Sequence, residues 1–181
     1  MSDPPFALFI TWTTYGTWLP GDPRGYVSNT LREDGTFEPK RNQRGTPYSR
    51  GDARTLASAQ RLQKHNTVWL SASQAATAAE ALVKAAAQRH WFIIRAAIMA
   101  SHIHTLTTKC PDDGSAVLRI FKGVTSAELS NKAGRPGRWW THGGSDRYLQ
   151  DQRAIDAVEH YIRQQQGILC EIVQMQVIPR I

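Results

Sequence analysis

The sequence predicts an α+β domain in which helices pack on an antiparallel sheet of four or five strands. Apolar, β-branched runs outnumber the helical segments, which does not fit a repeated β-α-β order. The two central runs, residues 90–100 and 102–109, have almost no linker between them, so they can pair only as antiparallel strands. The 181 residues, 41% of them hydrophobic, suffice for one domain with a substantial core.

The N-terminal part of the chain combines a strand with a long irregular segment. Residues 6–14 form an aromatic and β-branched run without strict alternation, typical of a strand buried on both faces. Residues 15–68 then show little periodicity and many turn residues. Irregular segments of this length are uncommon in compact domains unless they serve a function. We therefore expect a single domain over 1–181 with an insertion at about 15–68, which carries one short helix near 52–64.

Three helices are expected after the insertion. The first opens with Ser71 and Gln74 at capping-box spacing before an alanine-rich segment. The third stops at Gly167, since glycine readily adopts the left-handed conformation that follows many helices. The expected bounds are 71–88, about 114–133 and about 151–166.

Two more extended segments complete the predicted sheet. Residues 139–142 and 147–149 flank a pair of glycines, Gly143 and Gly144, and this pattern indicates a β-hairpin. Residues 168–178 form a last extended apolar stretch.

The net charge of +7 suits a polyanionic partner. Residues 15–66 hold nine Lys or Arg against five Asp or Glu, and residues 115–147 hold six against two. These two segments carry the positive charge, either as a nucleic-acid surface or as solvated basic loops. The candidate contact residues are Arg24, Arg41 and Arg44 in the first segment and Arg119, Lys122 and Arg138 in the second.

Composition also limits the class of protein. No apolar run approaches the roughly 18 residues that a membrane span requires. Residues 1–5 lack the basic and apolar regions of a secretory signal. Cys110 and Cys170 have no metal-type spacing and do not suggest a disulfide framework, so a reducing cytoplasm is the expected location.

A His-x-His motif lies at the start of the second central strand. His102 and His104 are two residues apart, so both imidazoles project from one face of that strand. Two adjacent imidazoles on a rigid strand form a two-point grip for a divalent metal. The alternative is a chance pair on a half-exposed strand.

The third helix adds a nucleophile candidate. Tyr161 and Gln165 are four residues apart, beside the apolar stripe, and so share a face. A tyrosine at such an edge is commonly a packed residue with a solvated hydroxyl. A phenol can also attack a phosphodiester and form a covalent phosphotyrosine. A metal held by His102, His104 and Gln165 would neutralise the charge on that phosphate.

Taken together, these motifs resemble the single-tyrosine HUH nucleases, which include insertion-sequence transposases of that type and the REP-associated tyrosine transposases. Ala100-Ser101 precedes the histidines where that family usually has Pro-Asn, and Gln165 resembles the insertion-sequence group. The matching segments, in the family's order along nearly the whole chain, are 9–12, 98–104, 121–123, 138–140 and 158–165.

The resemblance implies a ferredoxin-like HUH nuclease fold and a metal-dependent transposase that uses Mg²⁺ or Mn²⁺. Tyr161 would cut single-stranded, hairpin-forming DNA, leaving a 5′-phosphotyrosine and a free 3′-OH for rejoining. A homodimer remains open, as does whether Tyr161 acts on its own subunit's metal or a partner's. Trp18, Trp139 and Trp140 are candidates for stacking on unpaired bases, with core packing as the alternative.

Two other functions stay open at this stage. One is a domesticated, catalytically inactive nucleic-acid-binding module of the same fold. The other is a hydrolase that uses a metal-bound water, with Tyr161 only structural.

Overall fold

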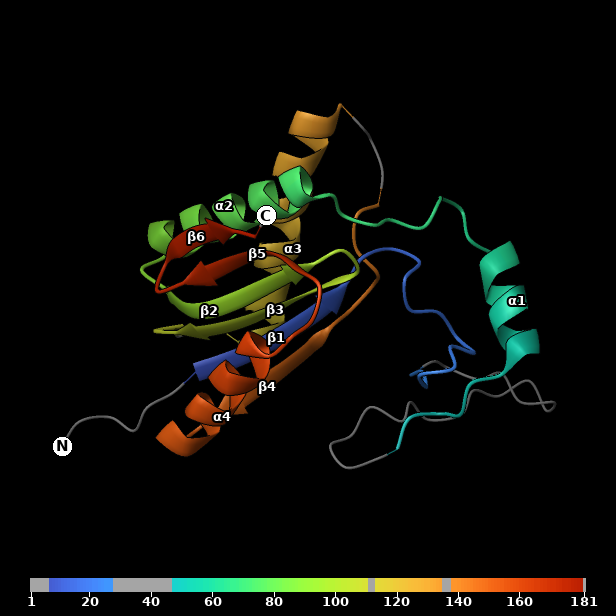
Figure 1. Cartoon of the computed structure of the whole chain (residues 1–181), viewed down its shortest axis with the longest axis horizontal. Helices are drawn as coiled ribbons and strands as arrows, with labels where there is room; N and C mark the ends of the chain where they lie inside the picture. Colours follow the sequence, from blue (N-terminus) through green and yellow to red (C-terminus); the bar gives the residue numbers. More distant parts are fainter. Residues whose placement is uncertain (1–6, 28–46, 111–112, 135–137, 181) are drawn as a thin grey trace. The chain divides into compact units, whose positions relative to one another are not determined.

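An antiparallel sheet of six strands lies at the centre of the larger of two units into which the chain divides (Figure 1). The computed structural model describes residues 7–27, 47–110, 113–134 and 138–180. The larger unit is Met1–Tyr15 with Val68–Ile181, and the smaller is Gly16–Thr67. The strand order is β4-β1-β3-β2-β5-β6. The strands are β1 (Ala7–Thr13), β2 (Phe92–Met99), β3 (His102–Thr108), β4 (Ser145–Leu149), β5 (Ile168–Val173) and β6 (Gln176–Pro179).

The architecture confirms the predicted α+β class and the antiparallel pairing of the central strands, β2 and β3. The sheet has six strands and not four or five, because residues 168–178 are not one continuous strand. The chain reverses between β5 and β6 at Gln174 and Met175, whose φ angles are 48° and 64°. Positive φ at both central residues is typical of a type I′ hairpin turn. Gln-Met carries none of the usual signals for that turn, so the sequence did not indicate it.

The hairpin predicted around Gly143 and Gly144 is wrong. Trp140 and β4 both lie alongside β1: Thr14 bridges to Trp140, and Thr11 pairs with Ser145. The two glycines therefore interrupt one irregular strand. Gly144 permits this because a Cβ there would lie 2.8 Å from the Thr11 carbonyl oxygen.

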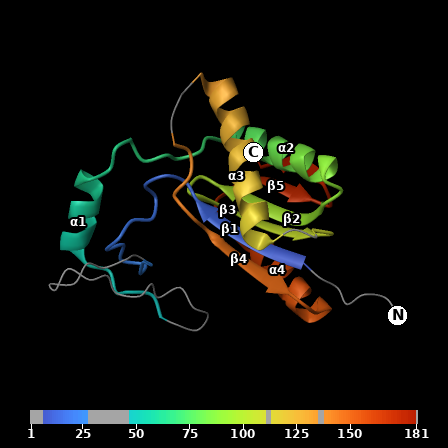
Figure 2. The same ribbon diagram turned by 180° about the vertical axis from the view of Figure 1, so that it is seen from behind.

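Helices cover both faces of the sheet. α2 (Ala72–Gln88) and α3 (Gly114–Ala133) pack on one face, where their apolar residues form the larger core with the strands. α4 (Gln152–Arg163) packs on the other face over a smaller apolar cluster. Figure 1 shows α4 in front of the strands, and the reverse view in Figure 2 brings α3 to the front. Residues that alternate along each strand therefore belong to different layers.

The start of α2 agrees with the capping signal in the sequence, whereas the end of α4 differs from the prediction. The capping box of Ser71 and Gln74 is present at the start of α2, with Ser71 Oγ accepting from the Gln74 backbone N–H. α4 ends at Arg163, before the predicted bound at 166, so Gln165 lies beyond the helix. The prediction that Gly167 stops this helix is therefore wrong: the C-cap is Gln164, and Gly167, with a φ of 68°, directly precedes β5.

The smaller unit contains the expected short helix, α1 (Ala53–Arg61). Asp52 caps it by accepting hydrogen bonds from the backbone N–H groups of Arg54 and Thr55. A single bridge pairs Tyr26 with Ser49 in antiparallel orientation. None of the helices in the described part of the chain has the length and apolar character that a membrane crossing demands.

Candidate active site

His102 and His104 lie on β3 and face the layer that contains α4. The two imidazole centroids are 4.9 Å apart, and the ring of Tyr161 on α4 lies 5.4 Å from that of His104. Both histidines face this layer because successive side chains of a strand point to opposite faces. Ile103, which lies between them, accordingly points into the core on the other face. The structure thus brings together three of the residues singled out in the sequence, although Tyr161 is 57 positions beyond His104 in the chain.

His104 is the buried member of the pair, with only 5% of its surface exposed. Its Nδ1 lies 2.7 Å from Thr11 Oγ1 on the neighbouring strand, β1. Its Nε2 is buried and has no hydrogen-bond partner among the described residues. Burial, with a smaller effect from His102, lowers the pKa of His104 to about 3. The imidazole is therefore neutral near pH 7, which is the form that binds metals.

His102 is half-buried and stands at the end of β3 next to the β2–β3 turn. Its Nδ1 lies 2.9 Å from Ser101 Oγ. Both histidines thus have Nδ1 beside a hydroxyl group. Metal-binding histidines commonly have the second ring nitrogen held by such a partner, which orients the ring.

Tyr161 lies at the border of the apolar stripe of α4. Ile155, Val158 and Ile162 form that stripe and are buried, whereas 47% of Tyr161 is exposed. The Tyr161 ring meets Phe9 of β1 edge-on, with centroids 6.0 Å apart. The tyrosine is therefore oriented by ring contacts on the sheet side and accessible on the solvent side.

Gln165 lies next to Tyr161 even though it is outside the helix. Its Nε2 donates to the Tyr161 carbonyl oxygen at 3.2 Å. Two imidazoles and the Gln165 amide would together suit a divalent cation in ligand type. The buried, unpartnered Nε2 of His104 supports this fit, since such atoms in native proteins usually have a partner. Among the described His, Cys, Asp and Glu residues, no three converge as a metal site.

Tyr148 of β4 is a further tyrosine of the sheet, and its hydroxyl has a structural role. It accepts a hydrogen bond from the Gly114 backbone N–H and donates to Asp113 Oδ1, both at 2.8 Å. These contacts tie β4 to the start of α3, on the face opposite to α4.

The basic residues that the sequence predicted as nucleic-acid contacts differ from one another in their surroundings. Lys122 Nζ is half-buried and donates to the carbonyl oxygens of Thr141 and Gly143, which ties α3 to the irregular strand beside β1. Burial, with a further effect from Arg138, lowers the Lys122 pKa. In the smaller unit, Arg24 pairs with Asp22 and donates to the Thr17 carbonyl oxygen. Arg119 and Arg138 are exposed, and Arg41 and Arg44 lie outside the described residues.

Trp139 and Trp140 are packed in the core, which was the alternative to base stacking. Trp139 and Trp140 are 2% and 4% exposed, and their indole N–H groups donate to Ser130 Oγ and the Lys122 carbonyl oxygen. Neither ring has a face available for stacking. Trp18 donates to the Gly25 carbonyl oxygen and packs edge-on against Tyr48 in the smaller unit.

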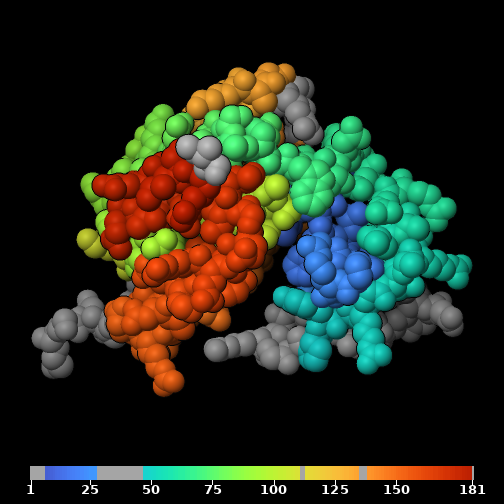
Figure 3. Space-filling view, viewed as in Figure 1, coloured from blue at the N-terminus to red at the C-terminus, as the bar shows by residue number. Residues whose placement is uncertain are grey.

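Trp69, which sequence reasoning missed, is 63% exposed. Its neighbours Val68 and Leu70 are buried, and the Leu70 N–H donates to the Ala100 carbonyl oxygen. Figure 3 shows this green segment beside the yellow-green β2–β3 turn that precedes His102. Val68, Trp69 and Leu70 are all apolar, so no signal in the sequence marked Trp69 as the exposed one of the three.

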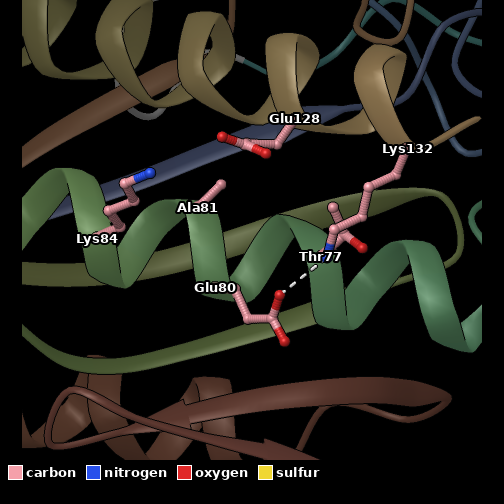
Figure 4. Close-up of a pocket in the computed structure, with 6 residues that line it drawn as sticks. All are labelled: Thr77, Glu80, Ala81, Lys84, Glu128 and Lys132. Carbon is pink, nitrogen blue, oxygen red and sulfur yellow. Dashed lines mark hydrogen bonds and ion pairs between the residues drawn. The ribbon is translucent and has the colours of Figure 1, made fainter.

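A separate depression of about 170 Å³ lies between α2 and α3, in the other helix layer (Figure 4). Lys132 Nζ is 3.1 Å from Glu80 Oε2 there, and both side chains are more than half exposed. The lining residues are Thr77, Glu80, Ala81, Lys84, Glu128 and Lys132. The charges are of mixed sign and solvated, so this depression is not a candidate active site.

No family model matches this chain, and no curated protein matches it in sequence. A search of solved structures finds a REP-associated tyrosine transposase bound to a REP hairpin, with a TM-score of 0.42 and 10% identity. The matched region covers 88% of this chain, but the chain spans only 63% of the length of that protein.

Proposed function

We propose that this protein is a metal-dependent nuclease and strand transferase for single-stranded DNA that forms a covalent intermediate through Tyr161. The observation that carries the proposal is the position of an accessible tyrosine 5.4 Å, ring to ring, from a neutral, buried histidine of a His-x-His pair. The motifs shared with single-tyrosine HUH nucleases support the same function.

In the proposed reaction, Tyr161 Oη attacks the scissile phosphorus. The new O–P bond forms as the bond between phosphorus and the 3′-oxygen breaks. The phenolic proton is lost to solvent, and the leaving 3′-oxygen takes up a proton to give a free 3′-OH. The DNA stays attached as a 5′-phosphotyrosine, so the 3′-OH of a second strand can reverse the step without another energy source.

His102, His104 and Gln165 would hold a divalent cation such as Mg²⁺ or Mn²⁺. When bound, the cation supplies Lewis-acid neutralisation of the charge on the phosphate. Thr11 and Ser101 orient the two imidazoles through Nδ1. Phe9 supports the rings of both His104 and Tyr161 from the sheet side. Hairpin-forming single-stranded DNA is the proposed partner, with Trp69 and Arg138 as exposed contacts.

The test is a search for a covalent adduct. The protein is incubated with Mn²⁺ and labelled single strands from the flanks of its own gene, then run on a denaturing gel. Wild type and the control Tyr148→Phe should give a labelled protein band, and Tyr161→Phe should give none while still binding DNA. Cleaved DNA without an adduct would favour the hydrolase that uses a metal-bound water. Binding without cleavage would favour the inactive module.

A further inference from the structure

Arg147 lies on the same face of the sheet as the candidate active site. It belongs to β4 and pairs directly with Phe9 on β1, so the two side chains project to the same side. The guanidinium carbon of Arg147 lies 5.5 Å from the centroid of the Phe9 ring. This is a cation–π arrangement, which holds a planar guanidinium in place while its N–H groups stay available.

Phe9 connects this cation to the two site rings. Its ring centroid is 5.5 Å from that of His104 and 6.0 Å from that of Tyr161. One aromatic ring therefore separates the Arg147 guanidinium from the tyrosine. The three contacts join side chains from β1, β3, β4 and α4.

The charge of Arg147 is not neutralised by its neighbours. The residue is exposed and forms no ion pair within the described ranges. The adjacent carboxylate, Asp146, faces the other layer: a Cβ added at Gly114, the first residue of α3, would lie 2.8 Å from Asp146 Oδ2. A ring-supported cation that has no ion-pair partner among the described residues is therefore one aromatic ring away from Tyr161.

We propose that Arg147 binds a phosphate of the single-stranded substrate next to the phosphate that Tyr161 attacks. The proposal rests on the function proposed above and deepens it by assigning a backbone-binding position. Arginine suits this role because its fork of N–H donors matches phosphate oxygens, and stacking on Phe9 fixes the plane of that fork. This phosphate contact sets the register of the strand over Tyr161.

The first test compares variants of the full chain. Arg147→Ala should lower the single-turnover rate of adduct formation at least tenfold and reduce the salt slope of DNA binding by about 0.7, the value for one phosphate contact on a single strand. Arg147→Lys should recover part of the rate, since the charge remains but the planar fork is lost. Arg153→Ala, an exposed arginine in the first turn of α4, is the matched control and should stay within twofold of wild type.

The second test locates the contact. Single phosphates of the DNA are replaced in turn by neutral methylphosphonates, and binding is measured for wild type and Arg147→Ala. We expect one position, adjacent to the cleavage site, where the substitution weakens wild type but not the variant. An Arg147→Ala protein that matches Arg153→Ala, or a penalty equal at all positions, would overturn the inference. Binding is measured separately from adduct formation. Absence of the adduct in wild type would therefore reject the proposed reaction, while the methylphosphonate series would still decide the phosphate contact.

Discussion

Thr11 Oγ1 lies 2.7 Å from His104 Nδ1, across the β1–β3 pair. This hydrogen bond occupies one ring nitrogen of His104, while the other, the buried Nε2, has no hydrogen-bond partner among the described residues. When Nδ1 carries the proton and donates it to Thr11, the Nε2 lone pair is available to a cation. The contact thus lets a side chain of β1 orient an imidazole of β3 that lies about 90 residues later in the chain.

His102→Ala should abolish metal-dependent adduct formation, because a single imidazole does not hold a divalent cation firmly against water. Gln165→Ala should have a smaller effect, since an amide is the weaker ligand and water can replace it. Mn²⁺ titration by calorimetry checks both variants, and EDTA should abolish the activity of wild type. Full activity in EDTA would reject the role of the metal.

Thr11→Val provides a separate check on the orientation of His104. The substitution removes only the hydroxyl at nearly constant volume. We expect Mn²⁺ affinity to fall about 10- to 100-fold, the usual effect of losing such a supporting contact. Unchanged affinity would show that Thr11 does not orient the ligand.

Lys122→Met should destabilise the fold. Lys122 Nζ satisfies two backbone carbonyl oxygens, at Thr141 and Gly143, in a half-buried position. Leaving these acceptors unpaired should cost about 1–3 kcal/mol in the free energy of unfolding. Urea denaturation measures the change, with Lys132→Met as an exposed control expected within about 0.5 kcal/mol of wild type. An unaffected Lys122→Met protein would return this lysine to the set of candidate DNA contacts.

Trp69→Ala should weaken binding of single-stranded DNA without unfolding the protein. An exposed indole that stacks on one base contributes about 1–3 kcal/mol, so we expect a loss of about 5- to 150-fold by fluorescence anisotropy. Trp139→Ala should instead cost about 3–5 kcal/mol of stability, because its ring is buried in the core. DNA affinity that is unchanged in Trp69→Ala would remove this residue from the interface.

DNA affinity should fall steeply with salt, because each neutralised phosphate releases counterions at a slope of roughly −0.7 per contact. Arg138→Glu and Arg119→Glu should each lower the magnitude of that slope, since both side chains are exposed. The pair Arg41→Glu and Arg44→Glu tests the insertion in the same assay: an unaltered slope would mark it as a solvated segment. A slope near zero for wild type would exclude nucleic acid as the partner.

Several features of this protein follow from local sequence alone. The capping box of Ser71 and Gln74 depends on residues only three positions apart, and the structure confirms it. The predicted stop at Gly167 is wrong, because the helix already ends at Arg163. The common face of His102 and His104 follows from the two-residue period of a strand, which needs no knowledge of the rest of the chain. The β5–β6 turn was missed because Gln174 and Met175 adopt positive φ without a residue that favours it.

Tertiary structure decided what surrounds each side chain. Sequence could not distinguish exposed Trp69 from buried Trp139, because burial depends on which distant segments cover a ring. Nor could it show that the Lys122 charge is used inside the fold while Arg147 stacks on Phe9, since these contacts depend on how strands and helices far apart in sequence are placed against one another. A residue's chemistry is local, whereas its neighbours are set by pairing across the whole sheet, and at this candidate site the neighbours determine which groups can act.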